Sequence, residues 1–413
     1  MKVKTNTPLF VCYISGMDVR RLTNTVTPYI ADLIDSCPHS YFTNLPSNEL
    51  FPTLVTGVNP AVHGVWGVQY ARNDTDSMVG RVVDAMPDAL TTTFQCFRHY
   101  VDSSFDLAAI PPRRRRHFKL TRTKYKRRSK QPEALFNIGG VPTVLGLAGR
   151  DRAHYSFSSS PDPVKKVLPE LCANGSLIEI LELYSLDRHQ QWNLDRPREA
   201  DQFYTVIDDF VRDLHKKCRH NDIALMLVSD HGHEPIKRSI DVCSRLQEMG
   251  LTDSDITYFI EVSSARFWPH TDRARNKLTE WLSAIDAGKL LKYDQMSAYN
   301  VPLTDDRYGE LFFYLDPGYI FFPHDFHHPL ARLFLGLTDS MQRSRLRDPR
   351  HKGNHGHLPG FEAERSMMLL ADPDFEVESS QSEIFDVAPS MLSIIGIDQP
   401  ASMCGRSIFR RRG

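Results

Sequence analysis

The sequence of 413 residues has no long hydrophobic run and almost no net charge. Near its N-terminus the apolar stretch runs only from Leu9 to Ile14, which is too short for the hydrophobic region of a signal peptide or for a membrane span. The formal net charge of −1 gives no overall field that would select a nucleic acid or a membrane as partner. We therefore expect a protein without a membrane partner.

Cysteine gives no sign of a disulfide framework or of a thiolate metal site. The seven cysteines are scattered, odd in number and without Cys-x-x-Cys spacing. We interpret them as reduced thiols and expect a cytoplasmic protein, with an odd extracellular thiol as the alternative. The sequence also has no internal repeat.

Short apolar runs that are typical of buried strands alternate with amphipathic helical patterns along much of the chain. The chain is long enough for one large α/β domain with an insertion. This alternation predicts an α/β fold with a wound, mostly parallel sheet flanked by helices. The predicted strands cover residues 8–14, 42–45, 141–148, 177–186, 222–228 and 366–371, and the clearest helix covers residues 200–218.

The alternation is interrupted between residues 234 and 307. We interpret this segment as an inserted α+β cap subdomain, in a core formed by residues 1–233 and 308–413. Its predicted elements are helices at residues 239–249 and 272–285 and a strand at residues 258–267. Beyond the insert, residues 311–322 predict a hairpin with a Pro-Gly turn.

A basic, irregular loop is predicted within the core at residues 102–131. From Arg113 to Lys130 it carries 11 positive and no negative charges, which leaves −12 on the rest of the chain. A solvated or disordered loop explains such a run, and so does an electropositive flap over an acidic substrate. Contact with a nucleic acid or an acidic partner is a further alternative, which the sparse aromatic residues do not favour.

Polar side chains follow two of the predicted strands. Asp230 and His231 come directly after the strand at 222–228, and Asp187 follows the strand at 177–186. In open α/β sheets, ligands bind at the carboxyl ends of strands. A late polar loop adds His355. Carboxylate oxygens mixed with imidazoles suit zinc, or manganese, better than calcium. An isolated Asp-His-Gly also fits a helix cap followed by a surface histidine.

Ser47 lies in a predicted turn between a strand and a helix, where a helix N-terminus favours an anion. A nucleophile would be placed in this way, although a serine at this position is usually a cap. Two divalent ions could lower the pKa of a hydroxyl and neutralise a transferring phosphoryl group.

The order of these groups along the chain resembles the alkaline phosphatase superfamily. The pattern Thr-Leu-Val-Thr-Gly-x-x-Pro-x-x-His-Gly at residues 53–64, together with Asp-His-Gly at 230–232, is most similar to the nucleotide pyrophosphatase and type I phosphodiesterase branch. The resemblance covers nearly the whole chain and implies an alkaline-phosphatase-like wound sheet. It implies Ser47 as the covalent nucleophile, with Asp230 and His231 holding the metal ion that activates it. Asp187 and His355 would hold the other ion.

Three positions depart from the family pattern: Ser15 replaces a carboxylate ligand, Gln191 an imidazole ligand and Val68 a phosphate-binding asparagine. Asp18 and His189 are candidate substitutes for the two lost ligands. The remaining candidates are Ser15, Gln191 and His357 as ligands or outer partners of a metal ion, and Asn48 and His233 as substrate-binding residues.

The sequence thus predicts a metal-dependent hydrolase of phosphate esters that acts on a small phosphodiester or nucleotide-like substrate through a covalent intermediate on Ser47. We expect one or two divalent ions, with zinc first and manganese as the alternative. The same site could transfer a phosphoryl or related group to another acceptor, or act on sulfate or phosphonate esters. A catalytically silent member that binds a ligand or partner is the hypothesis from a different class. The oligomeric state is left open.

Overall fold

The computed structural model describes residues 7–47, 49–71, 110, 112–120, 133–160, 175–325 and 347–412, with scattered single positions between these ranges. The candidate Asn48 and most of the predicted loop at 102–131 lie outside the described residues. The chain divides into two compact units. The first contains Met1–Val65, Arg127–Glu234 and Leu358–Gly413, and the second contains Trp66–Lys126 and Pro235–His357.

The first unit is built on one mixed sheet, which in the described residues has 7 strands in the order β20-β2-β18-β9-β1-β8-β7. At its centre β1 pairs in parallel with both β8 and β9. Of the pairings in this sheet, only those of β18 with β2 and with β9 are antiparallel. The strands are β1 (Leu9–Ile14), β2 (His39–Thr43), β7 (Ala153–Ser158), β8 (Ile178–Leu183), β9 (Ala224–Ser229), β18 (Arg365–Leu370) and β20 (Gln381–Glu383).

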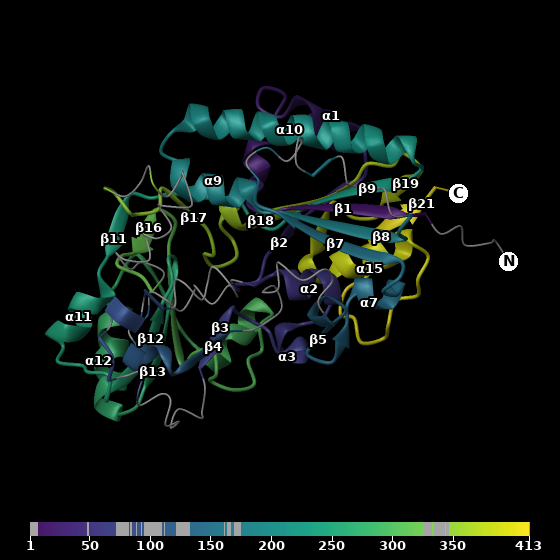
Figure 1. Cartoon of the computed structure of the whole chain (residues 1–413). Helices are drawn as coiled ribbons and strands as arrows, with labels where there is room; N and C mark the ends of the chain where they lie inside the picture. The colour runs from purple at the N-terminus through teal and green to yellow at the C-terminus, as the bar shows by residue number, and fades with distance from the viewer. Residues whose placement is uncertain are drawn as a thin grey trace. The chain divides into compact units, whose positions relative to one another are not determined.

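Helices lie on both sides of this sheet (Figure 1). On one side are α1 (Pro28–Ser36) and the long α10 (Pro197–His220), and on the other are α2 (Phe51–Thr56), α7 (Val144–Ala148) and α15 (Val387–Ile394). The predicted α/β class, with a mostly parallel sheet flanked by helices, is confirmed.

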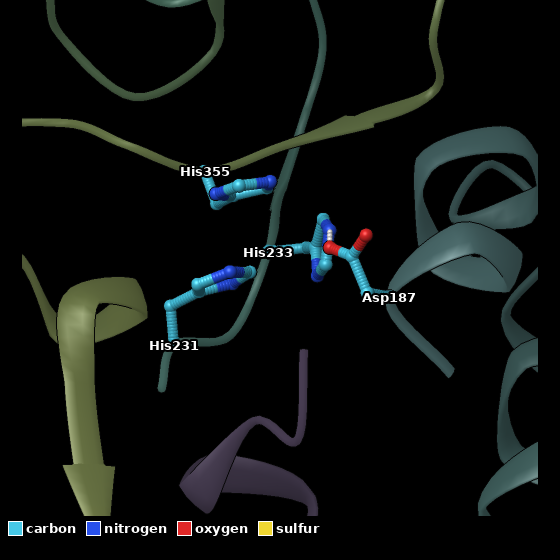
Figure 2. Close-up of side chains that lie close together, drawn as sticks. All are labelled: Asp187, His231, His233 and His355. Atoms are coloured by element: carbon cyan, nitrogen blue, oxygen red, sulfur yellow. Dashed lines mark ion pairs between the residues drawn. The ribbon is translucent and has the colours of Figure 1, made fainter. Parts of the chain in front are cut away.

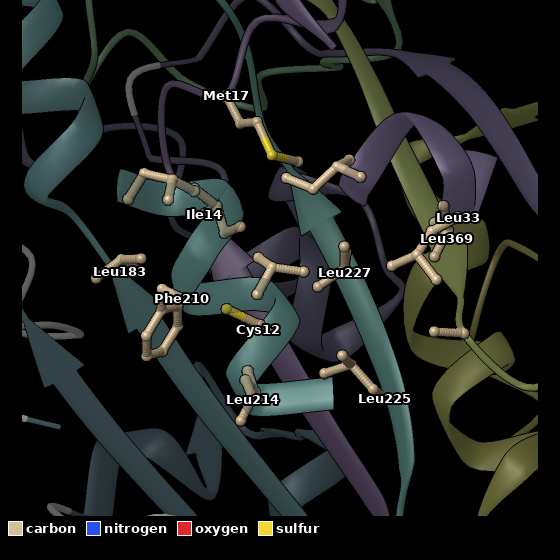
Figure 3. Close-up of a cluster of buried hydrophobic side chains, with 14 of the residues drawn as sticks. Cys12, Ile14, Met17, Leu33, Leu183, Phe210, Leu214, Leu225, Leu227 and Leu369 are labelled. Atoms are coloured by element: carbon tan, nitrogen blue, oxygen red, sulfur yellow. The ribbon is translucent and has the colours of Figure 1, made fainter. Parts of the chain in front are cut away.

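A continuous apolar core joins the sheet to α1 and α10. Alternate residues of β1 point to this face, so that Cys12 and Ile14 pack with Phe210 and Leu214 of α10. Figure 3 shows this cluster, in which Leu225 and Leu227 of β9 also take part. Burial of this core fixes the register of the strands, and therefore also the positions of the residues that follow their carboxyl ends.

Shorter elements complete the first unit. They are η1 (Val19–Arg21), α3 (Pro60–His63), η3 (Glu133–Leu135), β5 (Asn137–Ile138), β6 (Val141–Pro142), α9 (Ser185–Asn193), η6 (Glu362–Glu364), β19 (Phe375–Val377), η7 (Ile384–Asp386) and β21 (Phe409–Arg411). The two-residue strand β10 (Glu234–Pro235) lies where the chain passes from the first unit to the second.

The second unit has its own 4-stranded antiparallel sheet in the order β12-β13-β15-β14. Its strands are β3 (Gln69–Ala71), β4 (Phe118–Leu120), β11 (Arg238–Ile240), β12 (Ile256–Ile260), β13 (Ser264–Pro269), β14 (Gly288–Lys292), β15 (Leu311–Leu315), β16 (Tyr319–Phe321) and β17 (Gly353–Asn354). Its helices are α6 (Pro112–Arg115), α11 (Val242–Glu248), α12 (Asp272–Ser283) and η5 (Tyr293–Tyr299).

This unit is larger than the predicted insert of residues 234–307, because it also contains residues 66–126 and residues 308–357. The sheet includes β15, and the buried Arg266 donates to the Gln69 carbonyl oxygen at 2.8 Å. Arg114, at the start of the basic stretch, is also buried and pairs with Asp325 at 2.5 Å. Its guanidinium lies 3.9 Å from the centre of the Tyr258 ring. Arg114 therefore contributes a buried ion pair and a cation–π contact within this unit and is not part of a solvated loop.

Three local predictions are wrong. In the predicted strand at residues 141–148, only residues 141–142 form a strand, β6, and residues 144–148 form the helix α7. The Thr143 side chain caps this helix by accepting the Gly146 N–H at 3.1 Å. Residues 258–267 are parts of two antiparallel strands, β12 and β13. The predicted hairpin at 311–322 does not form, because β15 pairs with β13 and β14 whereas β16 pairs in parallel with β11.

Among the described residues, every helix is too short or too polar to cross a lipid bilayer.

Candidate metal centre

Three candidate residues of the first unit follow neighbouring strands of the sheet. Ser15 comes after β1, Asp187 comes after β8 in the first turn of α9, and Asp230 comes after β9. Because β1, β8 and β9 are parallel, their carboxyl ends lie at one edge of the sheet. The chain is tightly packed here: the Asp187 N–H donates to the Ser15 carbonyl oxygen at 3.0 Å, and a Cβ on Gly16 would lie 2.6 Å from the Asp187 Cα.

Asp187 is grouped with two imidazoles. Its Oδ1 lies 3.1 Å from His233 Nε2, and its Oδ2 accepts a hydrogen bond from Gln191 Nε2 at 2.8 Å. Ligand atoms of Asp187, His231 and His233 all lie within 4.8 Å of one another, and the three side chains are buried. Figure 2 shows Asp187 and His233 facing each other, with the ion pair marked; it also draws His355, a residue of the second unit.

The protonation of His231 depends on the surrounding carboxylates. Burial alone would lower the pKa of His231, but the negative charges of Asp230, Asp187 and Glu364 together raise the pKa above its ordinary value of 6.5. Because an imidazole binds a metal ion in its neutral form, binding at His231 would release a proton.

Asp230 has a different set of partners. Its Oδ2 accepts hydrogen bonds from the Tyr13 hydroxyl at 2.6 Å and the Ser15 hydroxyl at 2.9 Å. Its Oδ1 accepts the backbone N–H groups of Gly16 at 2.8 Å and of His231 at 2.9 Å. Burial, and then the charge of Asp230, raise the pKa of Tyr13 well above 10.0, so the phenol keeps the proton that it donates.

The donor chemistry of Asp187, His231 and His233 fits a divalent metal ion. One carboxylate oxygen and two imidazole nitrogens are ligands that zinc and similar ions prefer. Both oxygens of Asp230 accept hydrogen bonds from protein groups, and its Oδ2 also lies 3.4 Å from His231 Nε2.

Ser47 follows β2, which is parallel to β9 because β18 runs antiparallel to both. It therefore belongs to the same edge of the sheet as Asp187 and Asp230. The residue is 9% exposed, and its hydroxyl oxygen accepts the Glu49 N–H at 3.1 Å. The next helix, α2, begins only at Phe51, so this contact is that of a serine in a turn instead of a helix cap.

The two candidate substitutes for the lost ligands have other partners. The Asp18 carboxylate forms a salt bridge with Arg20, with the shortest N–O distance 2.6 Å. The His189 ring stacks on Phe203 at a centroid distance of 4.3 Å, and burial lowers the pKa of His189. Neither residue belongs to the metal-competent group around Asp187 in the described part of the chain. The other candidates, Val68, His355 and His357, belong to the second unit.

His63 has structural contacts within the first unit. Its Nδ1 accepts the Val65 N–H at 3.2 Å, so in the neutral ring Nε2 carries the hydrogen and donates to the Thr53 hydroxyl at 3.1 Å. Burial lowers the pKa of His63 to about 4. The hydrogen bond between His63 and Thr53 links α3 to α2, so both contacts of this histidine are structural.

Two residues of this centre were not predicted in their observed positions. His233 was predicted to bind substrate, yet its imidazole faces Asp187. The spacing of His231 and His233 could have indicated this, because side chains two residues apart in an extended segment lie on the same side. Tyr13 gave no signal, since its hydroxyl reaches Asp230 only after β1 and β9 have paired in register.

Comparisons with known proteins agree with the fold and with the resemblance in sequence. Residues 180–357 match the family described as type I phosphodiesterase / nucleotide pyrophosphatase. The chain is similar in structure to murine ectonucleotide pyrophosphatase / phosphodiesterase 5, solved as an inactive form in complex with AMP, with a TM-score of 0.63 and 13% identity. It is also similar to the human protein of that name, with a TM-score of 0.62 and 14% identity. Each similarity covers 95% of this chain and 96% of the other. No curated protein matches the sequence.

The matched family is one of phosphodiesterases and nucleotide pyrophosphatases, and the match covers residues 180–357 of this chain, in agreement with the resemblance that its sequence motifs predicted. The similarity to the two solved structures shows that the chain shares their fold.

Proposed function

We propose that the protein hydrolyses small phosphodiesters or nucleotide-like phosphate esters through a covalent intermediate on Ser47. The observation that carries this proposal is the buried group of Asp187, His231 and His233 at the carboxyl edge of the sheet. The match to the phosphodiesterase family gives the reaction class. Ser47 is assigned from the resemblance in sequence and from its place after β2.

The metal ion of this reaction would be held by Asp187, His231 and His233. The resemblance in sequence assigns His355 to a metal ion as well, because a late His-Gly completes the family's order of ligands along the chain. Zinc suits these donors best and manganese is the alternative. When bound, the ion would stabilise negative charge that develops on the phosphoryl oxygens.

The chemistry assigned to Ser47 has two steps. Ser47 Oγ forms a bond to phosphorus while the bond from phosphorus to the leaving alkoxide breaks, and the hydroxyl proton passes through solvent to the alkoxide, which leaves as an alcohol. Water then attacks phosphorus, the bond to Ser47 Oγ breaks, and a proton of that water passes through solvent to Oγ. The contact with the Glu49 N–H holds Oγ in the turn between β2 and α2 before the first step.

A nucleotide-like substrate is the most specific part of the proposal. The murine relative was solved in complex with AMP, which supports a nucleotide as the kind of ligand to test first. A cytoplasmic location, expected from the cysteines, is part of the same proposal.

The second candidate function is ligand binding without turnover. It is favoured by one observation: Ser15 and Gln191 replace a carboxylate and an imidazole of the family pattern, and both now donate hydrogen bonds to neighbouring aspartates. Transfer of the phosphoryl group to an acceptor other than water remains the alternative within the enzyme hypothesis.

The test is a panel of 4-nitrophenyl esters of phosphate, of thymidine 5′-phosphate, of phenylphosphonate and of sulfate, assayed with added Zn²⁺ or Mn²⁺. We expect the nucleotide diester to be turned over fastest, and Ser47→Ala to lower its turnover by at least ~10³-fold. Ser36→Ala, an exposed serine at the end of α1, is the matched control. Undiminished turnover in Ser47→Ala would remove the covalent mechanism, and no turnover by the unmodified protein would favour ligand binding.

A further inference from the structure

We infer that this centre binds one divalent metal ion, through Asp187, His231 and His233, and that Asp230 does not ligate a second ion. The inference rests on the proposed function only in assuming that a divalent ion occupies the centre. At the carboxyl edge of the sheet, Asp187 would then belong to a metal-binding position, whereas the Asp230 carboxylate would be held by hydrogen bonds from protein groups.

The first argument is the number of donors around Asp230. An ionised carboxylate offers about four acceptor positions. Tyr13, Ser15 and two backbone N–H groups occupy them at 2.6–2.9 Å. A cation at this carboxylate would have to displace at least one buried donor, and that donor would then lose its partner.

Ser15 lacks the negative charge that the family pattern has at this position. A carboxylate at position 15 would add a negative charge beside Asp230, and such a pair attracts a cation strongly. Serine removes that charge and supplies a proton donor, which points at Asp230 Oδ2. The local negative charge falls by one, and the hydrogen bond replaces the contact that a shared cation would otherwise provide.

Asp18 and His189, the candidate substitutes for the two lost ligands, are both bound to other groups. Both oxygens of Asp18 accept hydrogen bonds from the Arg20 guanidinium at 2.6–3.1 Å. Arg20 also donates to the His233 carbonyl oxygen at 2.9 Å, so its positive charge lies beside the backbone of the segment that carries His231 and His233. His189 is stacked on Phe203. In the described residues, the carboxylate and imidazole that were candidate substitutes are therefore both engaged elsewhere.

Asp187 has the opposite surroundings. The family's imidazole four residues after this aspartate is Gln191 here, but His233 supplies an imidazole whose Nε2 lies 3.1 Å from Asp187 Oδ1. The Gln191 amide donates to Oδ2, which orients the carboxylate with Oδ1 toward the histidines. His233 thus replaces the lost imidazole at this position, whereas Asp18, the candidate substitute for the carboxylate lost at Ser15, is paired with Arg20.

The experiment counts metal ions in the full chain. The protein is stripped with a chelator, titrated with Zn²⁺ by calorimetry, and analysed for bound zinc after removal of free ion. We expect one ion per chain in the unmodified protein and in Asp230→Asn. Asp187→Asn and His233→Gln should each weaken binding beyond the ~10–100-fold that loss of an outer partner causes. His189→Gln is the matched control for His233→Gln and should keep one ion. Ser15→Asp, which restores the missing carboxylate, should raise the count to two.

Two ions in the unmodified protein, one of them lost in Asp230→Asn, would overturn the inference, and so would the absence of any bound ion. Circular dichroism and thermal unfolding of each stripped variant separate loss of a ligand from loss of the fold. The outcome is distinct from that of the ester panel. Two bound ions together with turnover of esters would contradict the single-ion inference and support the proposed function. One bound ion without turnover would support the single-ion inference and contradict the proposed function.

Discussion

Asp187 and Asp230 occupy equivalent places in the fold and have different surroundings. Each follows a buried parallel strand that pairs with β1, and each is nearly inaccessible to solvent. Asp187 faces the His233 imidazole and accepts a hydrogen bond from the Gln191 amide, whereas Asp230 accepts hydrogen bonds from two hydroxyls and two backbone N–H groups. A place at the carboxyl end of a strand brings a carboxylate to the site, but the neighbouring donors decide whether it can bind a metal ion.

The two aspartates also contribute differently to stability. The oxygens of Asp230 satisfy two backbone N–H groups and two hydroxyls that are otherwise buried, so the native state depends on this carboxylate. The carboxylate of Asp187 faces the His233 imidazole, in the group of side chains that could hold a metal ion. We therefore expect substitution at Asp187 to affect function most, and substitution at Asp230 to affect folding most.

The largest expected effect is that of Asp187→Asn on turnover of the nucleotide diester. The amide keeps the volume of the side chain but loses the negative charge that would hold the ion between His231 and His233. Turnover should fall beyond the ~10–100-fold that loss of an outer metal partner causes, while the midpoint of urea unfolding of the stripped protein should change little. Retained turnover together with retained zinc would show that the ion is bound elsewhere.

Asp230→Asn should cost about 4 kcal/mol in the free energy of unfolding, because an amide oxygen can accept only part of the four hydrogen bonds and leaves buried donors without partners. The measurement is urea denaturation of the stripped proteins. Asp208→Asn is the matched control: among the described residues this buried aspartate accepts the N–H groups of Tyr29 and Ile30, so its loss should cost about 1–2 kcal/mol. Equal losses in the two variants would contradict the special role of the Asp230 network.

A comparison of histidines extends the contrast to pH. Burial lowers the pKa of His63 to about 4, below the 6.5 of an unfolded histidine, so the unfolded chain binds more protons between these values. The contribution of His63 to stability is therefore complete above pH 6.5 and falls by up to about 3 kcal/mol as the pH drops to 4. Denaturation curves of the unmodified protein and of His63→Gln should converge as the pH falls through this range. A pH-independent difference between them would contradict the assigned cause.

The smallest expected effect is that of Tyr13→Phe. Loss of the hydrogen bond from the phenol to a charged carboxylate should cost about 2 kcal/mol of stability. Three donors still surround Asp230, so the protein should keep a count of one zinc ion. A second ion gained by this variant would show that the phenol alone keeps a cation away from Asp230.

Much of this arrangement could be predicted from the sequence, because parallel buried strands have a clear pattern. The apolar runs before Asp187 and Asp230 identified β8 and β9, and the carboxyl-edge rule then placed both aspartates at one site. The family motifs added Ser47 by order along the chain. The local errors arose where an apolar run was short, as at residues 141–148, since a cap at Thr143 decides between helix and strand there.

The partners of the two aspartates could not be predicted, because they depend on contacts between distant segments. Tyr13 and Asp230 are 217 positions apart, and only the pairing of β1 with β9 brings them together. His233 reaches Asp187 because the chain passes close to Asp18 at Gly232, where an added Cβ would lie 2.5 Å from the Asp18 carboxyl carbon. No local pattern in the sequence encodes such an approach.

The most direct test of the difference between Asp187 and Asp230 is anomalous diffraction at the zinc absorption edge from crystals of the zinc-loaded protein. We predict one anomalous peak per chain, within bonding distance of Asp187, His231 and His233. A peak within bonding distance of the Asp230 carboxylate, alone or as a second peak, would contradict the account.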